Sequence, residues 1–77
     1  MVTPNDIKGW IEQGLSCESV TISGDGRHFD AVIVSDVFEG QSMIKRHRLV
    51  YEALGDRMRA DIHALSLATH TPSEQSA

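Results

Sequence analysis

The sequence predicts a small α/β domain of the α+β kind, in which a three-stranded mixed sheet carries both helices on one face. Two segments show helical spacing of apolar residues, and three shorter segments alternate apolar with polar residues. Their order is helix, strand, strand, helix, strand (αββαβ). A tight hairpin makes the first two strands antiparallel, whereas a strand–helix–strand connection makes a right-handed crossover to a parallel strand. This order therefore predicts a mixed sheet covered on one side.

The size and charge of the chain limit what it can do. With 77 residues it forms one domain, here expected over residues 1–72 and followed by a polar, frayed C-terminal tail over 73–77. A core this small favours binding on a face or in a shallow groove over a deep active site. The net charge of −4 disfavours nonspecific binding to phosphate backbones. The single cysteine, Cys17, excludes an internal disulfide and favours a reducing cytoplasm.

No part of the sequence indicates export or membrane insertion. The start, MVTPNDIKGW, lacks a charged segment followed by an apolar run, and no apolar stretch reaches the roughly 20 residues that a membrane span needs. The sequence therefore predicts a cytoplasmic protein with no membrane partner.

The first helix is expected to begin at Thr3 and Pro4 and to end near Gly14. Thr3 can accept hydrogen bonds from free backbone amides, Pro4 is tolerated at the first helical position, and Asp6 suits the positive end of the helix dipole. One apolar stripe with helical spacing faces the core: Ile7, Trp10, Ile11 and Leu15.

A hairpin follows the first helix. Residues 19–23 (SVTIS) and 28–35 (HFDAVIVS) alternate in the manner of half-buried strands, and GDGR between them supplies the glycines of a tight turn. Phe29, Ala31 and Ile33 are expected to point to one side of the second strand.

The second helix is expected to begin after Ser42, a plausible cap, and to be interrupted or ended at Gly55. The residues assigned to one side of it are Met43, His47, Val50, Tyr51, Leu54 and Met58, with Val50, Tyr51 and Leu54 expected to anchor it to the sheet. Residues 61–69 (DIHALSLAT) return to a period of two and predict the last strand, with Leu65 and Leu67 on one face.

Three cations gather on the second helix: Lys45, Arg46 and Arg48. Such a cluster can contact phosphates or a partner protein, but charged helix faces are more often merely solvated. No aromatic residues are interleaved with the cations. The sequence leaves these readings open.

The histidines and the cysteine give no local catalytic or metal motif. His28 and His63 both fall near the rim of the predicted sheet, where an imidazole is accessible as a metal ligand. Short ligand spacings such as those of zinc sites are absent, so a surface or hydrogen-bonded role is the simpler reading for each histidine. Cys17 has no neighbouring base and is expected to pack. No catalytic constellation emerges, and the chain is not expected to be an enzyme.

The motif FEGQSMIKRHRLVYEAL (38–54), followed by IHALSL (62–67) and TP (71–72), resembles the BolA family, and SGDGRHF (23–29) is similar to its IbaG-like branch. The resemblance implies a type II KH-like fold. It also implies a monothiol glutaredoxin partner, with which family members form a heterodimer around a shared [2Fe-2S] cluster and glutathione. The resemblance assigns His63 as one metal ligand and His28 as the second. No cluster is expected in the isolated chain, because a cluster usually takes four ligands and one cysteine cannot hold it alone.

Other readings stay open beside this one. A KH-like fold also suggests a nucleic-acid-binding regulator of transcription or stress, with Lys45, Arg46 and Arg48 on phosphates. KH modules clamp the backbone with a GXXG loop, but residues 40–43 read GQSM and lack the second glycine. A scaffold without metal is a third reading. The free chain is expected to be a monomer or a weak homodimer.

Overall fold

The computed structural model describes residues 2–76 and contains the five expected elements together with three short helical segments. The elements in chain order are α1 (Pro4–Gly14), β1 (Ser19–Gly24), β2 (His28–Val34), the 3-10 turn η1 (Asp36–Phe38), α2 (Met43–Leu54), α3 (Arg57–Ala60), β3 (Ala64–His70) and α4 (Pro72–Ser76). The predicted αββαβ order is confirmed.

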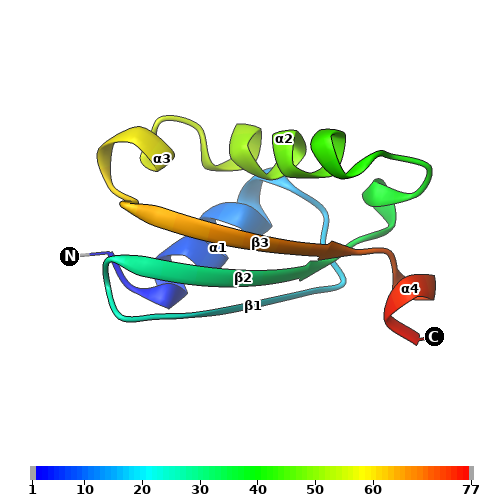
Figure 1. Ribbon diagram of the computed structural model, residues 1–77, viewed down its shortest axis with the longest axis horizontal. Helices are drawn as coiled ribbons and strands as arrows, with labels where there is room; N and C mark the ends of the chain where they lie inside the picture. Colours follow the sequence, from blue (N-terminus) through cyan, green and yellow to red (C-terminus); the bar gives the residue numbers. More distant parts are fainter. Residues whose placement is uncertain (1, 77) are drawn as a thin grey trace.

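The three strands form one sheet in the order β1-β2-β3 (Figure 1). β1 and β2 pair antiparallel, with Ser19 opposite Val34, and β2 pairs with β3 in parallel, with His28 opposite Ala64. The sheet is therefore mixed, as predicted from the hairpin and the crossover.

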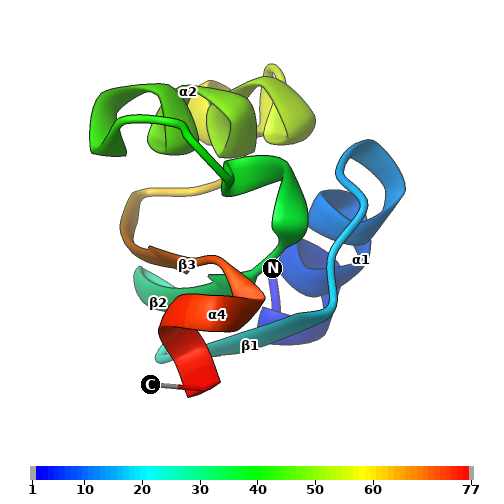
Figure 2. The same cartoon turned by 90° about the vertical axis from the view of Figure 1, so that its right-hand side faces the viewer.

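Both long helices lie on the same side of the sheet (Figure 2). The apolar side chains of all five main elements meet between the helices and the sheet, and the largest fully buried ones belong to Phe29, Phe38, Ile7, Ile11, Ile33, Leu54 and Val50. Alternation along β2 sends Phe29, Ala31 and Ile33 into this core, as predicted. The guanidinium of Arg57 lies 4.7 Å from the centre of the Trp10 ring, so a cation–π contact joins α3 to α1.

The helix starts follow the capping signals in the sequence. Thr3 and Asp6 form a reciprocal capping box at α1, and Pro4 occupies the first turn. At α2 the side chain of Ser42 accepts a hydrogen bond from the backbone N–H of Lys45 at 3.2 Å. Gly55 ends α2 with a φ of 60°, a conformation that favours glycine.

The orientation of α2 differs from the prediction at Tyr51. The buried row of the helix is Arg46, Val50 and Leu54, spaced four residues apart, whereas Tyr51 is 40% exposed. Met43 and Tyr51 lie on the neighbouring row, so the expectation that Tyr51 anchors the helix to the sheet is wrong. The side of α2 predicted to be buried therefore lies one helical row away from the row that is buried in the structure.

The C-terminal segment also differs from the prediction. Residues 72–76 form α4, and the backbone N–H and side chain of Thr71 exchange hydrogen bonds with Glu74. The prediction of a frayed tail is therefore wrong for residues 73–76. Residue 77 lies outside the described part of the chain. Within residues 2–76, no helix has both the length and the hydropathy to cross a membrane.

Candidate metal-ligand pair and basic helix

The fold brings His28 and His63 together at one end of the sheet. His28 is the first residue of β2, and the parallel register places it opposite Ala64, the residue after His63. The centres of the two imidazole rings are 5.9 Å apart, and the rings meet edge to face at 81°. Both side chains belong to exposed residues. A pair of residues that lie far apart in the sequence is therefore adjacent and accessible in the structure.

The hairpin turn holds His28 in place. A carboxylate oxygen of Asp25 accepts hydrogen bonds from the backbone N–H groups of Arg27 and His28, both at 2.9 Å. These bonds, first that from His28, lower the pKa of Asp25 below its ordinary value. The backbone N–H of Ala64 donates to the carbonyl of Arg27 at 3.1 Å, so the same turn is fastened to the start of β3.

The two imidazoles suit a metal centre that receives its other ligands from elsewhere. No hydrogen bond ties either ring within residues 2–76, so the rings can reorient and direct a nitrogen toward one metal. In the same part of the chain, no group of three or more histidine, cysteine, aspartate or glutamate residues could hold a metal ion. Two imidazole nitrogens on one iron are a ligand set known from [2Fe-2S] centres, and a cluster held by this pair would have to take its remaining ligands from another molecule.

The three cations of α2 do not form one surface. Lys45 and Arg48 are exposed and line a hollow of about 320 Å³ on α2, together with Glu52. Arg46 is only 9% exposed and is directed into the protein. The expectation that Arg46 belongs to a partner or nucleic-acid surface is therefore corrected. Its guanidinium is paired with Glu74 of the same chain.

Arg46 connects α2 to the C-terminal segment. Its two terminal nitrogens contact the two carboxylate oxygens of Glu74 at 2.8 and 3.0 Å. The guanidinium also donates to the carbonyls of Gln41 and Thr69 and lies 5.9 Å from the centre of the Phe38 ring. Glu74 raises the pKa of Arg46, and Arg46 in turn lowers that of Glu74 to about 2.

Cys17 has the packing role that the sequence predicts. Its thiol is half-buried and donates to the carbonyl of Leu15 at 3.3 Å. Burial raises the pKa of Cys17, and the nearby Glu12 raises it further, so the reactive thiolate is disfavoured.

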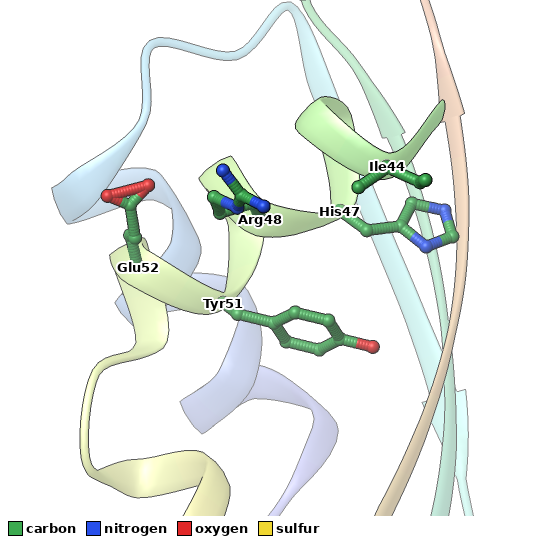
Figure 3. Close-up of a pocket in the computed structure, with 5 residues that line it drawn as sticks. All are labelled: Ile44, His47, Arg48, Tyr51 and Glu52. Atoms are coloured by element: carbon green, nitrogen blue, oxygen red, sulfur yellow. The ribbon is translucent and has the colours of Figure 1, made fainter. Parts of the chain in front are cut away.

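One surface feature, a hollow on α2, was not predicted from the sequence. Helix α2 carries a shallow hollow of about 490 Å³ lined by Ile44, His47, Arg48, Tyr51 and Glu52 (Figure 3). Ile44 is 73% exposed, and with Met43 and Tyr51 it is one of three exposed large apolar side chains on α2. The signal was present in the sequence, since Ile44 does not follow the apolar stripe of the helix.

Comparisons with known proteins agree with the motif. A family model described as BolA-like protein matches residues 12–74. Acid stress protein IbaG of Escherichia coli is 37% identical over 71 residues, covering 91% of this chain and 84% of IbaG. The DNA-binding transcriptional regulator BolA of E. coli is 40% identical over 52 residues, covering 68% of this chain and 50% of the regulator. SufE-like protein 1 of Arabidopsis thaliana is 51% identical over 47 residues, which are 61% of this chain and only 13% of that protein.

Solved structures share the whole fold. A bolA protein homologue from Coxiella burnetii has a TM-score of 0.88 and 56% identity, with both chains covered completely. The BolA domain of SufE1 from A. thaliana has a TM-score of 0.80 and 34% identity, covering 92% of this chain and 93% of that domain. From the match of the family model, the likeness to IbaG and the shared αββαβ architecture, it follows that the chain belongs to the BolA family.

Proposed function

We propose that this chain is a partner protein, not an enzyme, that shares a [2Fe-2S] cluster with a monothiol glutaredoxin and glutathione. In this proposal His63 and His28 are its two metal ligands, and the complex acts in iron–sulfur cluster trafficking or iron-linked regulation in the cytoplasm. The observation that carries the proposal is the meeting of two exposed imidazoles, 5.9 Å apart, at the end of the sheet.

The ligand count supports a shared centre. Two nitrogens satisfy half of the four ligands that a [2Fe-2S] cluster usually takes, and thiolates of the glutaredoxin and of glutathione would supply the rest. The BolA domain of a longer plant protein, SufE-like protein 1, supports a role in which a fold of this kind works beside another protein unit.

The residues around the pair have separate tasks in this proposal. His28 and His63 each offer a nitrogen, which must be unprotonated to coordinate, so acidification weakens binding. Asp25 fixes the backbone of the turn, and the bond from Ala64 to Arg27 keeps the turn beside β3. Coordination by imidazole in place of thiolate changes the charge and the potential of a [2Fe-2S] cluster.

The test is anaerobic reconstitution of the full chain with a monothiol glutaredoxin, glutathione, ferrous iron and sulfide, followed by visible absorption and circular dichroism. We expect a heterodimer spectrum that differs from that of the glutaredoxin homodimer. His63→Ala and His28→Ala should each abolish or shift it, because each removes one ligand. His70→Ala, at the opposite end of β3, is the matched control and should leave the spectrum unchanged.

Two results would count against the proposal. A spectrum identical to that of the glutaredoxin homodimer would mean that this chain contributes no ligand. Equal effects of His70→Ala and His63→Ala would mean that the spectrum reports general stability instead of ligation.

A second candidate function is nucleic-acid binding in regulation of transcription or stress. It is favoured by the similarity to an E. coli protein named as a DNA-binding transcriptional regulator and by the exposure of Lys45 and Arg48. With Arg46 engaged by Glu74, only these two cations of the cluster are free for phosphates. Binding of this kind requires a steep loss of affinity with added salt that becomes shallower in Lys45→Gln and Arg48→Gln variants.

A further inference from the structure

The strand β3 has a free edge. It pairs only with β2 within the described sheet. The backbone N–H of Ala64 donates to Arg27 and the carbonyl of His70 accepts from Ser35, both on the β2 side. In a parallel ladder the direction of these groups alternates along the strand. The residues whose backbone groups point away from β2 are therefore Leu65, Leu67 and Thr69.

This edge lacks the usual protection against pairing with another chain. Edge strands are commonly blunted by charged side chains, proline or a bulge. The seven residues of β3, ALSLATH, contain no lysine, arginine, acid or proline, and their register with β2 is unbroken. Arg46 contacts the carbonyl of Thr69 at 3.4 Å, which covers one end. The outward groups of Leu65 and Leu67 are left for another strand.

Helix α2 lies alongside this edge. Figures 1 and 2 both show α2 beyond β3, on the side away from β2. The hollow on α2 is lined by Ile44 and Tyr51, and Figure 3 shows His47 and Tyr51 extending from the helix toward the strands. The Nε2 atom of His47 is buried and makes no hydrogen bond within residues 2–76. A strand edge and an apolar helix face thus border the same part of the surface.

We propose that the free edge of β3 and the adjoining face of α2 bind an extended peptide segment of another protein, which adds a fourth strand to the sheet. Its backbone would pair with Leu65 and Leu67, and its alternate apolar side chains would contact Ile44 and Tyr51. An acidic side chain at one end would meet Arg48.

The chemistry of the surface favours a peptide over the alternatives. A peptide backbone offers both N–H donors and carbonyl acceptors, as the edge requires, whereas a nucleic-acid backbone offers no N–H donor. The net charge of −4 also opposes a polyphosphate. A second copy of this chain is disfavoured because each copy carries its own α2 alongside the same edge.

The test uses the iron-free chain and a defined probe, the acetylated and amidated heptapeptide Glu-Val-Thr-Val-Thr-Val-Glu. Amide hydrogen exchange is followed by NMR at single residues. In the free chain Leu65 and Leu67 should exchange faster than Ser66 and Ala68, whose N–H groups face β2. Saturating peptide should slow Leu65 and Leu67 by about tenfold or more, since their donors become paired.

Matched controls separate strand addition from nonspecific binding. One peptide carries N-methyl groups on alternate amides and its partner carries them on the other set; the form that lacks the paired N–H groups should not bind. Ile44→Ala and Tyr51→Ala should each lower the affinity for the peptide by about fivefold. Val32→Ala, also at an exposed apolar residue, should leave the affinity unchanged.

The proposal is overturned if both N-methylated peptides bind as the parent does, if no binding occurs at millimolar peptide, or if oligodeoxythymidine gives the same protection with a steep salt dependence. The proposed edge starts two residues after His63 but uses neither His28 nor His63, and the assay contains neither iron nor glutaredoxin. Failure here therefore leaves the cluster proposal standing, and failure of the cluster proposal leaves this one standing.

Discussion

Arg46 lies between Lys45 and Arg48 in the sequence, but the fold buries it while those two cations stay exposed. Its guanidinium is held by both oxygens of Glu74, by two backbone carbonyls and by the face of Phe38. Charge-assisted bidentate bonds of this kind are among the stronger hydrogen bonds in proteins. The pair joins α2 to α4, so it also gives α4 a defined position.

The Arg46–Glu74 pair predicts a stability that depends on pH. The ordinary pKa of Glu74 is 4.5 and its folded value is about 2, a depressed pKa, so the carboxylate stabilises the fold above pH 4.5. That contribution is lost as the pH falls from 4.5 toward 2. Glu74→Gln should therefore have a lower Tm than the parent chain at pH 7, and the difference should vanish near pH 2.

Thermal melts by circular dichroism between pH 2 and pH 7 would check this prediction. Glu12→Gln is the control, because Glu12 pairs with Lys8 at 3.0 Å in an exposed i,i+4 contact and should have little effect. A Tm difference for Glu74→Gln that is constant across the pH range would contradict the assignment.

At the residue scale, the sequence identified His28 and His63 as candidate ligands but misplaced Arg46 and Tyr51. The partner of Arg46 is 28 residues away, so local pattern could not reveal it. Tyr51 belongs to a helical row next to the buried one, and apolar character alone does not distinguish the two rows. Long-range pairing and helix rotation are set by packing across the core.

At the element scale, the start of α2 depends on one hydroxyl. Ser42→Ala removes the acceptor of the Lys45 N–H and should lower the free energy of unfolding by about 1 kcal/mol. Urea unfolding measures this change directly. Ser23→Ala, at an exposed position of β1, should stay within about 0.5 kcal/mol of the parent. A larger loss for Ser23→Ala would mean that the cap is not the cause.

Alanine substitutions at the two glycines of α1, Gly9 and Gly14, should change the free energy of unfolding in opposite directions. A methyl group at Gly9 would meet no atom within 4 Å, so Gly9→Ala should raise the free energy of unfolding by about 0.5–1 kcal/mol through reduced backbone entropy. At Gly14 the same group would lie 2.8 Å from the Cβ of Ala53 on α2. Gly14→Ala should therefore lower the free energy of unfolding by about 1–3 kcal/mol.

Chemical denaturation of the two variants side by side would test the close approach of the helices. Stabilisation by both substitutions would mean that α1 and α2 are farther apart than the structure shows. Destabilisation by both would mean that the backbone-entropy argument at Gly9 is wrong.

The long elements could be predicted because their signals are local. Capping residues mark the starts of both helices, and the glycine turn fixes the hairpin. The short helices could not be predicted in this way. α3 has only four residues, and the contact that stabilises α4 comes from Arg46, which is 28 residues away from Glu74 in the sequence.

At the scale of the whole molecule, the isolated chain should not retain a [2Fe-2S] cluster, because the two imidazoles proposed as ligands would supply only half of the usual set. Iron and sulfide reconstitution without glutaredoxin, followed by desalting and visible absorption, would test this. A stable chromophore at one cluster per two chains would contradict the expectation and indicate that two histidine pairs from a homodimer complete the centre.

The parallel pairing of β2 with β3 has a consequence for how such a protein can diversify. The spacing of the two imidazoles is set by the ladder between the strands and by the bond from Ala64 to Arg27. The connection from β2 to β3 carries η1, α2 and α3 and ends at His63, so only its last residues border that spacing, whereas η1 and α2 precede them in the chain. Substitutions in η1 and α2 can therefore change the surface of the crossover while the backbone positions of His28 and His63 stay constant.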